Sequence, residues 1–140
     1  MSLDMKIENT IITKGFIIAG LMNASVLIFS RLFTNTTIAE FDPIVMSNFG
    51  LLMILIWGLA YMSVAKSYQQ VKWLIGVFAL EKLIYAGVWS NWMLNNNLAE
   101  VYAQDLMAGV FYSIYGINDW VFFSFFIFVF VQSCKVKNSQ

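Results

Sequence analysis

The segment Trp73–Leu94, WLIGVFALEKLIYAGVWSNWML, decides the fold class of this chain, because it places two charged residues inside an apolar run. The run is long enough to cross a bilayer as a helix, which takes about 20 apolar residues. Glu81 and Lys82 stand near its middle, about 14 Å along the helix from Lys72 at about 1.5 Å per residue. A charged side chain at the centre of a membrane helix costs roughly 2.5–3.5 kcal/mol on insertion scales. We therefore expect both charges to be compensated by polar neighbours, a third charge or a ligand.

The composition indicates a small membrane protein rather than a soluble domain. Only 11% of the 140 residues are charged and 60% are hydrophobic, whereas a soluble domain carries about 25% charged residues. Eight basic and eight acidic residues give no net charge, so we expect no nucleic-acid partner. The sequence has no histidine and a single cysteine, Cys134. This excludes His/Cys metal sites, haem ligation by histidine, Ser-His-Asp triads and internal disulfides, and we expect no cofactor.

Four apolar runs predict an all-α fold, an integral membrane four-helix bundle formed by residues 1–140 as a single domain. The predicted helices cover about residues 15–33, 44–65, 73–94 and 112–134. Asp42 is expected to cap the second helix, with Pro43 at its first position. We expect the ends, Met1–Thr10 and Lys135–Gln140, to be mobile tails.

The start of the last helix admits two interpretations. One long tilted helix could begin near Asp105, or the segment Gly116–Asn118 could break it and leave Asp119 as the cap of a shorter span. Gly, Asn and Asp in succession favour the break. Residues 98–116 would then form a helix at the outer surface of the membrane. The phenylalanines that follow predict a last helix that faces lipid or a partner protein.

The charges that flank the predicted helices indicate how the protein is oriented. Six lysines lie on one side of the membrane if there are four spans, and they are Lys6, Lys14, Lys66, Lys72, Lys135 and Lys137. The other side has only Arg31, together with several acidic residues. Because cytoplasmic loops carry an excess of Lys and Arg, we expect both termini to be cytoplasmic.

Polar residues inside the predicted helices define a candidate ligand site. The candidate residues are Glu81, Lys82, Asp119, Asn23, Tyr61, Tyr85, Trp57 and Trp89. Glu81 and Lys82 would orient a polar end, whereas Trp57, Tyr61, Tyr85 and Trp89 would hold an apolar body. A Lys82–Asp119 pair is geometrically reasonable, and Gly20 and Gly58 would let helices approach closely. Three interpretations of the charges stay open: a structural ion-pair network, a ligand site, and a proton or ion path. Asp119 could equally be a plain helix cap.

The chain resembles the small, mostly uncharacterised bacterial four-helix membrane proteins described as BphX-like or DoxX-like. The similar features are Asn23, the stretch from Phe41-Asp42-Pro43 to Gly58-Leu59-Ala60-Tyr61, Lys82, and Asn118-Asp119-Trp120. The resemblance covers most of the chain but rests on short motifs. It implies a four-helix fold and a multi-pass location in a bacterial inner membrane, and it implies no chemistry. Glu81 and the phenylalanine-rich last helix depart from it. The layout is more distantly similar to four-helix sterol isomerases and sterol-binding receptors, but the lack of histidine argues against membership.

Two classes of function follow from these features. The first is a small integral membrane protein that binds an apolar or amphipathic small molecule or lipid in the bundle. The alternative is an accessory or assembly subunit of a larger membrane complex, in which the last helix would dock a partner protein or another copy of the chain. An enzyme is the third interpretation, because general acid–base chemistry would rest on Glu81 or Asp119 alone. A retinal Schiff base on Lys82 is a further, less favoured alternative.

Overall fold

The computed structural model describes residues 2–137, which are predominantly helical and contain no strand. The elements in chain order are α1 (Leu3–Ala24), α2 (Val26–Phe29), α3 (Thr36–Phe41), α4 (Asn48–Val64), the short 3₁₀ helix η1 (Tyr68–Gln70), α5 (Lys72–Asn95), α6 (Leu98–Gln104) and α7 (Leu106–Lys137). The helix α5 covers the whole of the predicted range 73–94.

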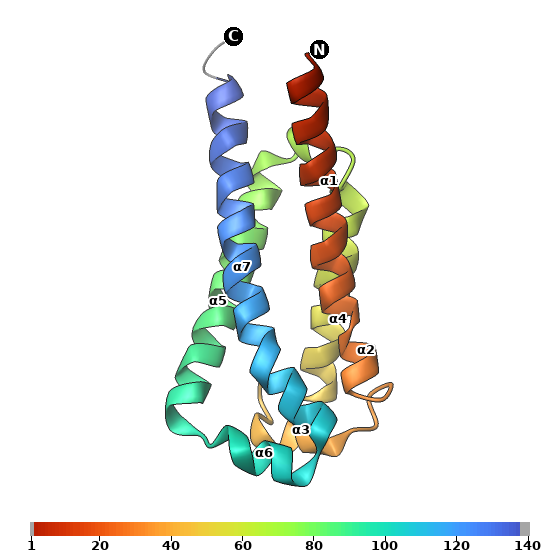
Figure 1. Cartoon of the computed structure of the whole chain (residues 1–140), viewed down its shortest axis with the longest axis vertical. Helices are drawn as coiled ribbons and strands as arrows, with labels where there is room; N and C mark the ends of the chain where they lie inside the picture. Colours follow the sequence, from red (N-terminus) through yellow and green to blue (C-terminus); the bar gives the residue numbers. More distant parts are fainter. Residues whose placement is uncertain (1, 138–140) are drawn as a thin grey trace.

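The long helices α1, α4, α5 and α7 run along the long axis of the molecule (Figure 1). Helix α1 packs mainly on α4, and α5 packs mainly on α7. Both termini lie at one end, here called the terminal end, whereas α3 and α6 close the other end, here called the α3–α6 end (Figure 1).

Three helical stretches among the described residues are long and apolar enough to cross a membrane: Leu3–Phe29, Lys72–Asn95 and Leu106–Lys135. Helix α4 is apolar too, but it has only 17 residues. Since a span needs about 20 helical residues, with a range of about 17–25, α4 lies at the lower limit.

The first helix begins earlier and ends sooner than the predicted range 15–33. The Ser2 hydroxyl accepts a hydrogen bond from the backbone N–H of Met5 and caps α1, so most of the expected tail is helical. At the other end, α2 stops at Phe29, and Arg31, Leu32 and Phe33 have φ angles of 48°, 56° and 66°. A left-handed backbone cannot continue a right-handed helix, so the span ends before residue 33.

The second predicted helix also begins at a different residue. Helix α4 starts at Asn48, where the Ser47 hydroxyl accepts a hydrogen bond from the Gly50 N–H at 3.1 Å. Asp42 is instead the C-cap residue of α3. Its carboxylate accepts a hydrogen bond from the Val45 N–H in the turn that follows. The prediction that Asp42 and Pro43 open the membrane helix is therefore wrong.

The favoured break at Gly116–Asn118 is wrong, because α7 is one continuous helix from Leu106 to Lys137. Gly116 serves packing rather than chain reversal: a Cβ atom at this position would overlap the indole ring of Trp89. The Trp89 Nε1 donates a hydrogen bond to the Tyr112 carbonyl at 2.7 Å. Asp119 consequently lies inside a helix and is not a cap, and of the separate helix predicted for residues 98–116 only α6 is present.

The phenylalanines of α7 face the protein interior more than expected. Phe126 is fully buried, and Phe122, Phe123, Phe125 and Phe130 pack against the same apolar core. Phe128 is exposed, as expected for a lipid-facing side chain. The sequence could not show this, since a helix that is apolar all round gives no sign of which face is buried.

Two apolar cores fill the two halves of the molecule and leave a polar layer between them. One core, near the terminal end, contains Phe16, Tyr61, Phe78 and Phe126. The other, toward the α3–α6 end, contains residues that include Trp92 and Tyr112. Along the chain, Asn23 of α1 lies between the buried Ala19 of the first core and Val26 of the second, which begins α2.

Small residues bring α1 and α4 into close contact at the level of the polar layer. A Cβ atom on Gly58 would lie 2.7 Å from the Asn23 Cβ and 2.8 Å from the Gly20 carbonyl oxygen. Only glycine fits such a close backbone approach, as the two glycines in the sequence predicted. The contact fixes where Asn23 stands relative to α4.

Candidate functional site

The centre of the polar layer is Lys82, whose side chain is only 1% exposed. Its Nζ donates one hydrogen bond to Asp119 Oδ1 at 2.7 Å and another to Asn23 Oδ1 at 2.8 Å. The ammonium also lies 5.3 Å from the centre of the Tyr61 ring, which is close enough for a cation–π interaction. The three N–H groups of the ammonium therefore have two oxygen acceptors and an aromatic face.

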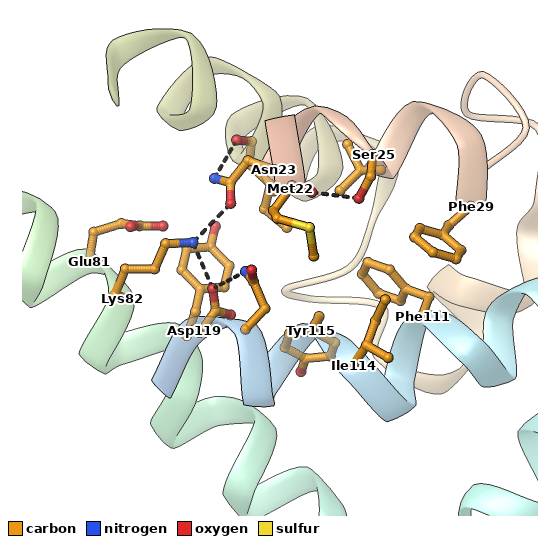
Figure 2. Close-up of a pocket in the computed structure, with 14 residues that line it drawn as sticks. Met22, Asn23, Ser25, Phe29, Glu81, Lys82, Phe111, Ile114, Tyr115 and Asp119 are labelled. Carbon is orange, nitrogen blue, oxygen red and sulfur yellow. Dashed lines mark hydrogen bonds and ion pairs between the residues drawn. The ribbon is translucent and has the colours of Figure 1, made fainter. Parts of the chain in front are cut away.

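The hydrogen bonds around Lys82 connect the long helices with one another. The Asn23 side chain on α1 donates to the Ile54 carbonyl of α4 at 2.9 Å and accepts from Lys82 of α5. Lys82 in turn pairs with Asp119 of α7. Figure 2 shows the side chains of Asn23, Lys82 and Asp119 converging from their separate helices.

Glu81 points to a different partner from its neighbour. Its carboxylate accepts a hydrogen bond from the Tyr61 hydroxyl on α4. Its side chain forms no ion pair with any residue that the structure describes. The two adjacent side chains thus bond to different partners, as their positions on the helix predicted: Glu81 makes no ion pair, but it lies within electrostatic range of the Lys82 ammonium.

The polar layer borders a small, partly enclosed cavity (Figure 2). Its polar lining consists of Asn23, Ser25, Glu81, Lys82, Asn118 and Asp119, and its other walls are Met22, Val26, Phe29, Ile54, Tyr85, Phe111, Ile114 and Tyr115. The volume of the cavity is about 30 Å³. Because a cavity needs about 10–15 Å³ of such volume for each water molecule, it can hold about two waters or a small polar group.

Two buried polar atoms of the cavity lining lack a hydrogen-bond partner among the described residues, Asn118 Oδ1 and Tyr115 Oη. The Asn118 amide donates weakly to Asp119 at 3.4 Å, which leaves its carbonyl oxygen as an open acceptor. A buried polar atom without a partner costs about 1–3 kcal/mol. The open acceptor therefore favours a hydrogen-bond donor inside the cavity.

A second space lies on the outer side of α5. It is a groove between α4 and α5, lined by Trp57, Val77, Leu80, Glu81, Ile84 and Tyr85. The volume of the groove is about 260 Å³. Glu81 and Tyr85 line both the groove and the cavity, and they form the partition between the two spaces.

Five of the eight candidate site residues line the cavity: Asn23, Glu81, Lys82, Tyr85 and Asp119. Tyr61 contacts the same cluster through Glu81, and Trp57 lines the groove. Trp89 lies outside both spaces, which differs from the prediction that it holds a ligand. Its indole is committed to the contact with Gly116 and Tyr112.

The candidate residues predicted from the sequence did not include Asn118 or most of the apolar walls of the cavity. Phe111, Ile114, Tyr115 and Asn118 follow one another at spacings of one or three residues and share a face of α7. This spacing was a usable signal. It was overlooked because the predicted break would have placed these residues in a separate surface segment.

A second polar cluster closes the α3–α6 end. Asp105 pairs with Arg31 at 2.8 Å, accepts from the Asn35 side chain at 2.9 Å and caps α7 through the Ala108 N–H at 2.8 Å. Burial acts to raise the pKa of Asp105, but these hydrogen bonds outweigh it and hold the pKa below its ordinary value. The cluster ties α7 to the turn after α2.

Comparison with protein-family models, curated proteins and solved structures gives no match for this chain. Among the described residues, no group of three or more His, Cys, Asp or Glu side chains could hold a metal ion. The arrangement offers a fixed ion pair, a buried acid bonded to the Tyr61 hydroxyl and an open acceptor on Asn118, all beside apolar walls.

Proposed function

We propose that this chain is an integral membrane protein that binds an apolar or amphipathic small molecule, such as a lipid, within its helical bundle. The cavity supports the proposal, because it joins a polar end made of Glu81, Lys82, Asn118 and Asp119 to aromatic and aliphatic walls. With a volume of about 30 Å³ it would hold only the polar group of such a molecule, whose apolar body would lie in the adjoining groove. Small-molecule sites usually combine mostly apolar walls with a few convergent polar groups. A purely structural ion pair would explain Lys82 and Asp119, but it would explain neither a second buried acid, Glu81, that makes no ion pair nor the open Asn118 acceptor.

The bundle would cross the membrane four times. Helix α1 runs from the terminal end toward the α3–α6 end, and α5 begins again at the terminal end (Figure 1). Helix α4 connects these two positions and packs along α1. If α1 and α5 cross a bilayer, α4 must cross it as well, and its 17 residues are just sufficient.

The terminal end would face the cytoplasm. It holds five of the six lysines that flank the spans, Lys6, Lys14, Lys66, Lys72 and Lys135, whereas Arg31 at the α3–α6 end is paired with Asp105. This asymmetry supports the orientation by the positive-inside rule. The resemblance to BphX-like and DoxX-like proteins supports the inner membrane of a bacterium as the location.

Thermal unfolding in mild detergent with a panel of single-chain lipids, sterols and quinones tests the binding proposal. We expect at least one ligand class to raise the melting temperature of the wild type, since a ligand stabilises the state that it binds. The shift should be lost in Lys82→Met and kept in Lys66→Met, which removes an exposed lysine. If no member of the panel shifts the wild-type protein, the proposal fails.

A further inference from the structure

The groove between α4 and α5 combines an apolar surface with one acid. Leu80 and Ile84 are more than half exposed on it, and Trp57 forms its α4 side. Glu81 is the one residue with a carboxylate or an amine among its lining residues. Exposed apolar side chains on a membrane helix face lipid, so the groove is a place where a lipid chain meets a buried carboxylate.

The charges around Glu81 decide which head group fits. Lys82, the adjacent cation, donates its hydrogen bonds to Asp119 and Asn23 and makes no ion pair with Glu81. An anionic head group would therefore find no free cation and would meet Glu81 and Asp119 as like charges. A cationic head group would supply Glu81 with the partner that a buried acid needs in a low dielectric. The adjoining cavity also contains the open acceptor oxygen of Asn118, Oδ1, toward which an ammonium N–H could point.

The sizes of the two spaces agree with a molecule that has a small head and a long body. The volume of the cavity is only about 30 Å³, whereas that of the groove is about 260 Å³. A whole ligand would not fit the cavity without side-chain movement. A small ammonium could lie at the partition formed by Glu81 and Tyr85 while its alkyl chain occupies the groove.

We propose that the α4–α5 groove is a lateral binding site for a cationic amphiphile, a protonated long-chain amine whose ammonium binds Glu81 and whose chain lies against Trp57 and Ile84. This inference rests on the proposed binding function and names its ligand class and its route of entry from the lipid. Glu81 is the specificity-determining residue, and Glu81 with Asp119 repels anionic head groups.

Fluorescence quenching of the full chain in detergent micelles tests the site. The probes are octadecylamine that carries a vicinal dibromide at mid-chain, the matching dibrominated stearic acid and the matching alcohol. Bromine quenches tryptophan on contact, and Trp57 lies in the groove. We expect saturable quenching by the amine, competed by unbrominated octadecylamine, with an affinity about tenfold above that for the acid. This comparison of head groups uses the wild type and needs no variant.

Variants then locate the site and its charge. Glu81→Gln keeps an acceptor for the Tyr61 hydroxyl and should reduce the preference for the amine to about twofold or less, whereas Glu100→Gln on the exposed face of α6 should preserve it. Trp57→Phe should remove most of the saturable quenching.

Equal affinity for amine and acid, unchanged in Glu81→Gln, would overturn the inference and leave the binding function standing. Saturable quenching that is unchanged in Trp57→Phe would overturn the location in the groove. If no probe quenches saturably and no ligand of the thermal panel stabilises the protein, both proposals fail.

Discussion

Lys82 is the residue on which the interior of this protein depends. Its ammonium would be costly in an apolar core, and Asp119, Asn23 and the Tyr61 ring together offset that cost. Each of these groups comes from another helix. The charge therefore specifies how α1, α4 and α7 are placed around α5, in addition to what it contributes to stability.

Lys82→Met and Asp119→Asn test whether the two charges act as a pair. Each change alone should lower the free energy of unfolding by about 3–5 kcal/mol, because it leaves one buried charge uncompensated. The double variant should recover part of the loss, with a coupling of about 1 kcal/mol or more. Unfolding in a titration of denaturing detergent measures all four proteins. Strict additivity of the two single losses would show that the residues do not interact.

Asp105 predicts a dependence of stability on acid. Its pKa in the folded protein lies below the ordinary 3.8, so the ionised form is the stabilising one. Its contribution is present above that value and is lost as the pH falls through the folded pKa. Asp105→Asn should cost only about 1 kcal/mol or less at neutral pH, because Arg31 is half exposed and asparagine still caps α7.

The measurement is the melting temperature of wild type and Asp105→Asn from neutral pH to about pH 3. The difference between the two proteins should shrink as the pH falls. A constant difference over the whole range would contradict the assignment.

At the scale of single residues, the sequence predicted the polar part of the site better than its apolar part. Asn23, Lys82 and Asp119 stand out because polar groups in apolar runs are costly and need partners. Phe111 and Ile114 do not stand out, since nothing distinguishes a cavity wall from any other core residue in a sequence that is mostly apolar. For the same reason, the sequence does not show that Trp89 lies outside both spaces.

Helices α5 and α7 pack closely where the indole ring of Trp89 lies against Gly116. Trp89 of α5 fills the space above Gly116 of α7 and bonds to the Tyr112 carbonyl. The sequence predicted that Gly116 breaks the helix, because local helix propensity carries no information about packing against a tryptophan that is distant in the chain. Packing between helices overrides such propensities.

Gly116→Ala should lower the free energy of unfolding by about 1–3 kcal/mol, since the added methyl group overlaps the Trp89 ring and must push α5 and α7 apart. Gly87→Ala is the matched control, because a Cβ there meets nothing within 4 Å. It should be neutral or stabilising by up to about 1 kcal/mol, owing to the better helix propensity of alanine. Thermal unfolding in detergent measures both, and equal losses would show that the Trp89–Gly116 contact is unimportant.

The starts of the first, second and last predicted helices were predicted poorly because they depend on side-chain caps. Ser2, Ser47 and Asp105 each accept a backbone N–H and fix where a helix begins. Hydropathy locates the apolar centre of a span, but it does not choose among several Ser, Asp and Asn residues that could cap it.

For the whole molecule, the all-helical fold followed from composition and from the length of the apolar runs, and the structure confirms it for residues 2–137. Three helices have the length and hydropathy of spans. The polar layer between two apolar cores could not be predicted, because it depends on how far each helix slides along its neighbours.

The proposed orientation predicts opposite labelling of the two ends. In intact bacterial cells, a membrane-impermeant maleimide should react with Asn96→Cys at the α3–α6 end in a Cys134→Ser background. It should leave the native Cys134 near the C-terminus unlabelled until the cells are opened. Labelling of Cys134 from outside would reverse the topology.

The alternative of an accessory subunit makes a different prediction at this scale. A stoichiometric second chain should copurify with the protein in gentle detergent and be identified by mass spectrometry. Its presence would indicate that the exposed apolar surfaces of the bundle dock a protein, whereas the binding proposal needs only lipid around them.

A high-resolution experimental structure of the protein purified in lipid nanodiscs tests the central claim most directly. We predict elongated density in the α4–α5 groove that ends within hydrogen-bond distance of Glu81, beside an intact Lys82–Asp119 pair. A groove filled only with disordered lipid, together with a cavity that holds ordered water alone between Glu81 and Asn118, would contradict the claim that this interior is a ligand site.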